Sequence, residues 1–155
     1  MKLEISEGNF LVTIKDDNIQ QVNFDDMACV EKYFKKILLQ LKELYNIDIK
    51  GFYYIYAYID LNEGIVLEIE KETIDYYDSF HQLELRILKE NTDFLYEVED
   101  IIDFLYNDLD IYVYNNRFYI KNNHHNKNYN LYEFGNLIYK ETKKIIENGK
   151  KVTIL

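Results

Sequence analysis

The strongest constraint on the fold is a helical repeat of apolar residues between residues 25 and 45. Apolar side chains recur there at every third or fourth position, namely at Met27, Val30, Phe34, Ile37, Leu41 and Leu44. In an α-helix this spacing places all six side chains on one face. Asp25 or Asp26 precedes the first turn and is predicted to cap it. The repeat covers too few heptads for a coiled coil, so it predicts one helix that lies on a β-sheet.

Segments on both sides of this helix alternate between apolar and polar residues, which predicts β-strands. The predicted strands before residue 72 are residues 2–6, 9–15, 51–59 and 65–71. Residues 60–64 form a hairpin connection between the last two of these strands. Residues 16–18 predict a turn, and residues 19–24 predict a short extended segment. The first 71 residues therefore predict the order ββαββ.

The second half of the chain predicts further short strands and helices. The predicted strands are residues 83–88, 94–98, 111–114, 117–120 and 152–155, and the predicted helices are residues 100–105 and 140–148. Gly149 is expected to end the last helix. Asn115-Asn116 lies between two alternating runs and predicts a type I′ hairpin turn. The acidic and aromatic residues 72–80 predict a linker or a crossing loop.

Residues 131–139 leave two alternatives open. Leu131, Phe134 and Ile138 have helical spacing, but Gly135 interrupts the pattern. With either alternative the element order predicts an α+β fold, an antiparallel β-sheet with helices packed on one face. A chain of 155 residues suits one compact domain. Its similar-sized halves, about 1–71 and 91–155, are expected to form a sandwich.

Charge and composition restrict the class of partner and the compartment. The net charge is −10, from 28 acidic and 18 basic residues, so nucleic-acid backbones and anionic membranes would be repelled. The predicted partners are therefore proteins. The single cysteine, Cys29, cannot form an internal disulfide, the N-terminus lacks a signal-peptide pattern, and no stretch is apolar enough to span a bilayer. These features predict a cytoplasmic protein.

Sixteen tyrosines are the other strong bias of the composition. Tyrosine, asparagine, isoleucine and lysine have AT-rich codons, so a low-GC bacterial genome explains the excess more directly than function does. Tyrosine also serves contact surfaces well, because it is large, rigid and partly polar. Both explanations are compatible with a tyrosine-rich protein that binds other proteins.

Residues that could carry catalysis or bind a metal each have a simpler explanation. Cys29 at the start of the helix is interpreted as a small, partly buried apolar residue rather than a reactive thiol. His124-His125 is interpreted as a solvated loop tip, and His81 as a surface residue. Asp100 and Asp103 share a helix face, as the carboxylates of a hydrolase would, but carboxylates are abundant here and these two are expected to be solvated. The sequence therefore predicts no catalytic residue, no cofactor and no metal site.

Three stretches of the second half resemble the MecA family of adaptor proteins, which deliver substrates to the ClpC AAA+ unfoldase of low-GC Gram-positive bacteria. They are the strand and acidic helix start at residues 94–104, the tyrosine-rich hairpin at residues 111–120, and the segment Leu131 to Ile138. Residues 49–71 resemble the hairpin that ends the family's N-terminal domain. The resemblance implies adaptor activity, a ClpC-type partner, and a strand with a bulge at Gly135. The family's long charged linker has no counterpart here, nor does a helix expected between the hairpin and residue 131.

The leading functional hypothesis is a non-enzymatic protein-binding adaptor or regulator. Its predicted contact patch is the hairpin surface formed by Tyr112, Tyr114, Arg117 and Tyr119, because exposed aromatic residues together with arginine favour binding hot spots. Strands alternate, so half of the hairpin residues are expected to belong to the core instead. Two other classes stay open. One is an acidic inhibitor or DNA mimic encoded by a phage, which requires a contiguous stripe of carboxylates. The other is a small carboxylate-dependent enzyme, which requires a pocket lined by several carboxylates.

Overall fold

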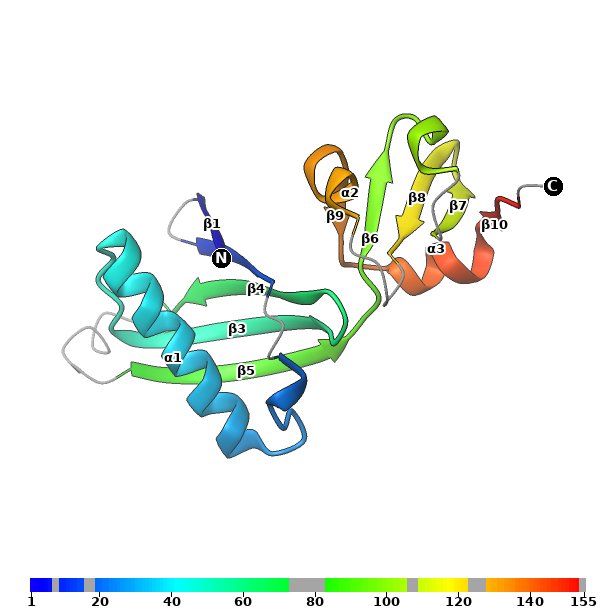
Figure 1. Cartoon of the computed structure of the whole chain (residues 1–155). Coiled ribbons are helices and arrows are strands. Elements are labelled where there is room, and N and C mark those ends of the chain that lie inside the picture. Colours follow the sequence, from blue (N-terminus) through cyan, green and yellow to red (C-terminus); the bar gives the residue numbers. More distant parts are fainter. Residues whose placement is uncertain (7–8, 16–18, 73–82, 106–108, 123–127, 154–155) are drawn as a thin grey trace. The chain divides into compact units, whose positions relative to one another are not determined.

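The chain folds into two compact units, Met1–Glu90 and Asn91–Leu155, here called unit 1 and unit 2 (Figure 1). Each unit contains one five-stranded sheet, called sheet A in unit 1 and sheet B in unit 2. The computed structural model describes residues 1–6, 9–15, 19–72, 83–105, 109–122 and 128–153. The turn predicted at residues 16–18 and nearly all of the crossing segment predicted at residues 72–80 lie outside these ranges. The predicted α+β class is confirmed.

Unit 1 contains the predicted ββαββ order followed by one more strand. Its elements are β1 (Lys2–Ser6), β2 (Asn9–Ile14), the 3₁₀ helix η1 (Ile19–Gln21), α1 (Met27–Tyr45), β3 (Gly51–Asp60), β4 (Gly64–Lys71) and β5 (Leu83–Asn91). The strand order is β1-β2-β4-β3-β5. The pairs among β1 to β4 are antiparallel, whereas β5 runs in the same direction as β3 (Figure 1). The extended segment predicted at residues 19–24 is wrong, because η1 starts there.

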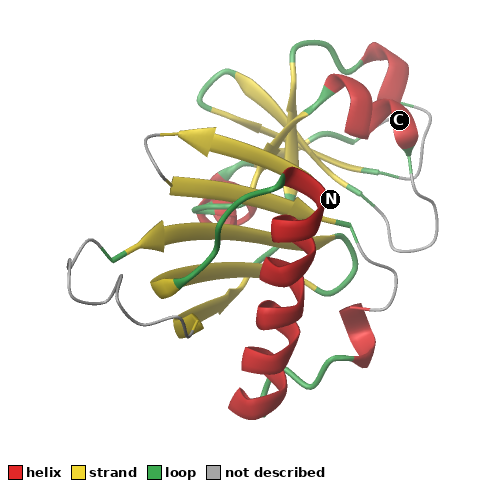
Figure 2. Ribbon diagram, turned by 90° about the vertical axis from the view of Figure 1, so that its left-hand side faces the viewer, coloured by secondary structure: helices red, strands yellow, loops and turns green. Residues whose placement is uncertain are grey.

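Helix α1 packs along one face of sheet A, where the core of unit 1 lies (Figure 2). The buried side chains of the helix are Val30, Phe34, Ile37, Leu38 and Leu41. They pack with alternate residues of the strands, among them Tyr53, Ile55, Ala57, Ile59, Ile65, Leu67 and Ile69.

The two ends of the predicted helical stripe do not belong to this core. Met27 is 52% exposed and Leu44 is 68% exposed, so the sequence pattern overestimates the length of the buried face. Asp26 is the N-cap, and its Oδ1 accepts a hydrogen bond from the backbone N–H of Ala28 at 3.0 Å. This contact satisfies one of the amides that a helix start leaves without an intrahelical partner. Among the described residues, no helix is both long and apolar enough to cross a membrane.

Unit 2 is an antiparallel sheet of short strands in the order β10-β7-β8-β6-β9. Its elements are β6 (Leu95–Val98), the 3₁₀ helix η3 (Ile102–Phe104), β7 (Asp110–Tyr114), β8 (Arg117–Lys121), α2 (Tyr129–Phe134), β9 (Asn136–Ile138), α3 (Thr142–Asn148) and β10 (Lys150–Lys151). The helix predicted at residues 100–105 is shorter than expected. The strand predicted at residues 152–155 is wrong at residues 152–153, which follow β10 and are not in a strand, and residues 154–155 lie outside the described residues.

The ambiguous stretch at residues 131–139 contains a helix end and a strand, separated by Gly135. A Cβ atom at Gly135 would lie 2.7 Å from the carbonyl oxygen of Leu131 and 2.9 Å from Cβ of Tyr96. Contacts this short exclude a side chain, so glycine permits the helix end to pass close to β6. The chain then continues directly into β9, which pairs with β6.

Helices cover both faces of sheet B, unlike the single covered face that the sequence predicts. On one face, Leu131 of α2 and Phe104 of η3 pack with Tyr96, Ile111 and Ile120. On the other face, Ile145 of α3 packs with the strand neighbours of those residues, Leu95, Tyr112 and Tyr119. Successive residues of a strand point to opposite faces, and β6, β7 and β8 each carry apolar residues at consecutive positions, so both faces of the sheet require cover.

Candidate functional site

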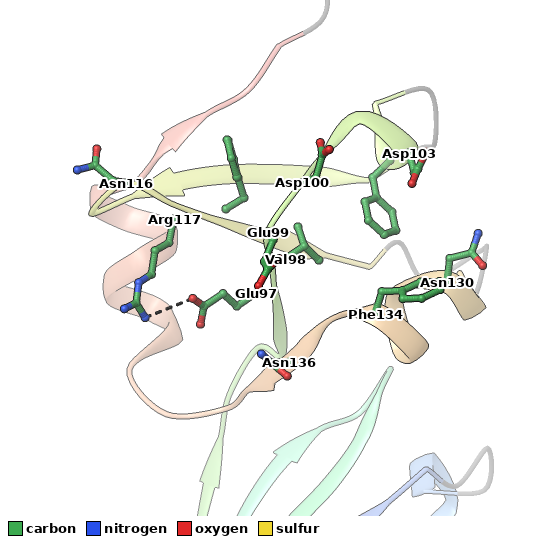
Figure 3. A pocket seen from close by; sticks show the side chains of 12 residues that line it. Glu97, Val98, Glu99, Asp100, Asp103, Asn116, Arg117, Asn130, Phe134 and Asn136 are labelled. Atoms are coloured by element: carbon green, nitrogen blue, oxygen red, sulfur yellow. Dashed lines mark hydrogen bonds and ion pairs between the residues drawn. The ribbon is translucent and has the colours of Figure 1, made fainter.

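A groove of about 830 Å³ lies in unit 2, at the end of sheet B where β6 stops and β8 and β9 begin (Figure 3). Its walls come from the end of β6, the segment that leads into η3, the β7–β8 turn, α2 and the start of β9. The turn is the predicted type I′ hairpin, since Asn115 and Asn116 have φ angles of 50° and 61°. Several short elements therefore converge on one surface.

One wall of the groove is acidic. It carries the carboxylates of Glu97, Glu99, Asp100 and Asp103 against the single guanidinium of Arg117, a formal excess of three negative charges. Arg117 Nη1 lies 3.3 Å from Oε1 of Glu97, and their side chains are 64% and 25% exposed. An ion pair this exposed contributes about 1 kcal/mol at most, so it orients Arg117 more than it stabilises the fold.

Asp100 also shapes the backbone of the acidic wall. Its Oδ1 accepts a hydrogen bond from the backbone N–H of Ile102 at 2.9 Å, at the first residue of η3. Figure 3 shows Asp100 and Asp103 on the segment that forms this turn, both beside the groove. The 3₁₀ turn therefore brings two carboxylates that are three residues apart to the same rim.

The rest of the lining consists of apolar side chains and three asparagines, Asn116, Asn130 and Asn136. Val98 and Phe104 are buried in the core of sheet B, and Phe118 packs against the same core. Phe134 is different, because its side chain is 70% exposed, the largest value among the large apolar residues of the described chain. It is the last residue of α2, and its ring stands beside the groove (Figure 3). Fully burying a phenylalanine side chain contributes roughly 2–3 kcal/mol, so this ring is a potential anchor for a ligand.

The hairpin patch predicted from the sequence is not one exposed surface. Tyr112 pairs with Tyr119, and Tyr114 pairs with Arg117, so all four side chains lie on one face of sheet B. Tyr112 and Tyr119 are buried there under Ile145 of α3, and Tyr114 packs at the margin of the same cluster. Arg117 alone of the four lines the groove. All four residues lie on one face, so strand alternation does not explain why some are buried and one is exposed. The difference arises because α3 covers Tyr112 and Tyr119 but not Arg117.

Cys29 differs from its sequence interpretation in one respect. The thiol is exposed rather than partly buried. Its S–H donates to Oδ2 of Asp26 at 3.4 Å, and this hydrogen bond, with smaller contributions from desolvation and from the charge of Asp26, raises the pKa of Cys29. A helix N-terminus favours the thiolate, but here the adjacent carboxylate dominates.

The described residues contain no group of three or more histidine, cysteine, aspartate or glutamate side chains placed to hold a metal ion. His81, His124 and His125 lie outside the described residues. The groove itself was only partly visible in the sequence. The shared face of Asp100 and Asp103 was a usable signal, whereas the helical spacing of Phe134 suggested burial.

Comparisons of this chain with protein-family models, with curated proteins and with solved structures find no match. The resemblance to the MecA family therefore stays a prediction that rests on the sequence stretches named above.

Proposed function

We propose that this protein is a non-enzymatic adaptor or regulator that binds protein partners through the groove of unit 2. The observation that supports this proposal is the exposed ring of Phe134, which lines the same groove as the carboxylates of Glu99, Asp100 and Asp103. An exposed large aromatic residue at a groove is typical of a binding hot spot. Four carboxylates line the same groove, which is the feature that a small carboxylate-dependent enzyme requires, so that class stays open as the second candidate. The exposed ring of Phe134 favours the adaptor, because a binding surface uses such a ring and carboxylate chemistry does not need it.

The groove favours a basic segment that carries an apolar side chain. Lysine or arginine of the partner would meet the acidic wall, where the excess of negative charge favours encounter and orientation. An apolar side chain of the same segment would cover Phe134, and an adjacent arginine could also lie over the ring face. The partner therefore needs both a basic and an apolar side chain. A polycation without an apolar side chain would bind the acidic wall alone.

Peptide binding tests the proposal. Fluorescence anisotropy of a labelled peptide with alternating arginine and leucine would be compared with that of a peptide with serine in place of leucine. Phe134→Ala should weaken binding of the arginine–leucine peptide by about tenfold, which corresponds to about 1.4 kcal/mol. Glu133→Gln is the matched control, because it changes the exposed neighbour of Phe134 that does not line the groove. Equal affinity of all three proteins for both peptides would contradict the proposal.

The same experiment separates the adaptor from an acidic inhibitor or DNA mimic. A mimic uses carboxylates and does not need an apolar anchor. In the peptide assay, a mimic would therefore bind the arginine–leucine peptide less tightly in the Glu99→Gln/Asp100→Asn variant and with unchanged affinity in Phe134→Ala. The adaptor should lose affinity in both variants.

The resemblance to the MecA family adds a specific partner to the proposal, the N-terminal domain of a ClpC-type unfoldase. A pull-down with that domain should recover the wild-type protein and less of the Phe134→Ala variant. Recovery of neither protein would remove ClpC as the partner and leave the peptide result as the test of the groove.

A further inference from the structure

Strand β5 (Leu83–Asn91) is a long edge of sheet A. It has nine residues, whereas the other sheet edges, β1, β9 and β10, have five, three and two residues. An edge strand presents backbone N–H and C=O groups that can pair with another strand, and natural proteins commonly keep such edges short. The inward residues of β5 pack on the core of unit 1, and its outward residues are exposed.

We propose that β5 pairs antiparallel with β5 of a second copy of this chain and joins two copies of sheet A into one continuous sheet. The two-fold axis passes between the two Leu88 residues. Leu88 then faces Leu88 of the second copy, and Arg86 of each copy faces Glu90 of the other. This pairing does not involve the groove of unit 2 and is independent of the function proposed above.

Charge complementarity supports a second copy of this chain as the partner of the β5 edge. Arg86 and Glu90 are exposed, and neither forms an ion pair with another residue of the described chain. They lie four residues apart on one strand, which separates them by about 13 Å and prevents pairing within a copy. Across the proposed axis, directly opposite side chains have Cβ atoms about 5 Å apart. Two ion pairs that cannot form within one chain would therefore form between two.

The pattern of side chains selects this register among its neighbours. The cores of both copies stay on the same face of the joined sheet only if residues of the same face oppose each other. Three neighbouring registers that meet this condition oppose like charges. The register centred on Arg86 pairs Arg86 with Arg86, and the register centred on Ile87 pairs Glu84 with Glu90. The register centred on Lys89 pairs Lys89 with Lys89. Unlike charges are opposed in the register centred on Leu88 and in the more distant one centred on Leu85, which pairs Glu84 with Arg86. Of these two, the register centred on Leu88 is the one that brings the two Leu88 side chains together.

The same register covers an exposed apolar side chain. Leu88 is 58% exposed and points to the face of sheet A opposite to the core. At the two-fold axis the two Leu88 side chains cover each other, which removes apolar surface from water in both copies. Cross-strand pairs of this kind, together with new backbone hydrogen bonds, are the usual source of stability at joined edges.

Sedimentation velocity of the full chain over a range of concentrations tests the proposal. The wild type should show a concentration-dependent monomer–dimer equilibrium. Arg86→Glu should weaken the dimer by at least about tenfold, because it turns two attractive pairs into two repulsive ones. The double variant Arg86→Glu/Glu90→Arg should restore it, because the swapped charges pair again. Lys36→Glu on the exposed side of α1 is the matched control for the change in net charge, and it should dimerise like the wild type.

A second pair of variants covers the case in which a charge variant fails to fold, which circular dichroism would reveal. Leu88→Lys should abolish the dimer, whereas Leu61→Lys, at another exposed leucine, should not. A wild type that stays monomeric at every concentration overturns the proposal. An extended segment of another protein is then the alternative partner of the β5 edge. A dimer that survives Arg86→Glu, or that the charge swap fails to restore, also overturns it.

Discussion

The carboxylate of Asp26 accepts hydrogen bonds from two neighbouring residues at the start of α1. Its Oδ1 accepts from the backbone of Ala28, and its Oδ2 accepts from the thiol of Cys29. The second contact raises the pKa of Cys29, so less thiolate is present at a given pH than for an unperturbed thiol. The reactivity of this exposed cysteine therefore depends on a helix cap.

Removing the charge of Asp26 should make Cys29 more reactive. Asp26→Asn keeps an N-cap acceptor but removes the carboxylate, so the pKa should fall toward its ordinary value and the thiolate fraction should rise. Alkylation by iodoacetamide below that pKa should be faster for the variant, and the two rates should converge at high pH. Asp25→Asn is the control for a lost charge that does not contact the thiol. A slower reaction of Asp26→Asn than of the wild type would contradict this assignment.

Gly64 is the residue whose replacement should be most damaging to the β3–β4 hairpin. It has a φ angle of +147°, and a Cβ atom there would lie 2.1 Å from the carbonyl oxygen of Ile14 on β2. Gly64→Ala should lower the free energy of unfolding of unit 1 by at least about 2 kcal/mol, from backbone strain and the displaced strand. Urea denaturation measures the change. Asn62→Ala in the same connection should stay within about 0.5 kcal/mol.

Elements with a regular period could be predicted from the sequence, because burial of one face imposes the period directly. Helix α1 and strands β1 to β4 follow this rule. The groove could not be predicted in the same way. Phe134 has helical spacing with Leu131 and Ile138, but the helix ends at Gly135, so the three residues do not share one face. Its exposure depends on where a helix stops, and spacing alone does not encode that.

The β7–β8 hairpin is an element whose local chemistry was visible in the sequence. Asn115 and Asn116 both have positive φ, and a residue other than glycine or asparagine in that conformation costs about 1–2 kcal/mol. Asn116→Ala should therefore destabilise unit 2 by about 1 kcal/mol, whereas Asn116→Gly should be neutral or stabilising. Both substitutions delete the same side chain, so the difference in their unfolding free energies isolates the backbone effect. Equal stabilities would contradict the type I′ assignment.

At the scale of the whole molecule, each unit has its own core. The cluster around Phe34 consists of residues of unit 1, and the clusters around Ile120 and Ile145 consist of residues of unit 2. Cooperative unfolding follows shared cores, because a cavity weakens the residues that pack around it. We therefore expect each unit to respond to substitutions in its own core.

Core truncations in the two units test this expectation against the single domain predicted from the sequence. Phe34→Ala should cost about 3–5 kcal/mol and Ile120→Ala about 2–5 kcal/mol. In hydrogen exchange measured by mass spectrometry, Phe34→Ala should speed exchange in α1 and β2–β4 and leave β6–β8 unchanged, and Ile120→Ala should do the reverse. Faster exchange throughout the chain in both variants would instead indicate one cooperative domain. The outcome also bears on function, since a groove held by the core of unit 2 should keep its affinity for the arginine–leucine peptide in Phe34→Ala and lose it in Ile120→Ala.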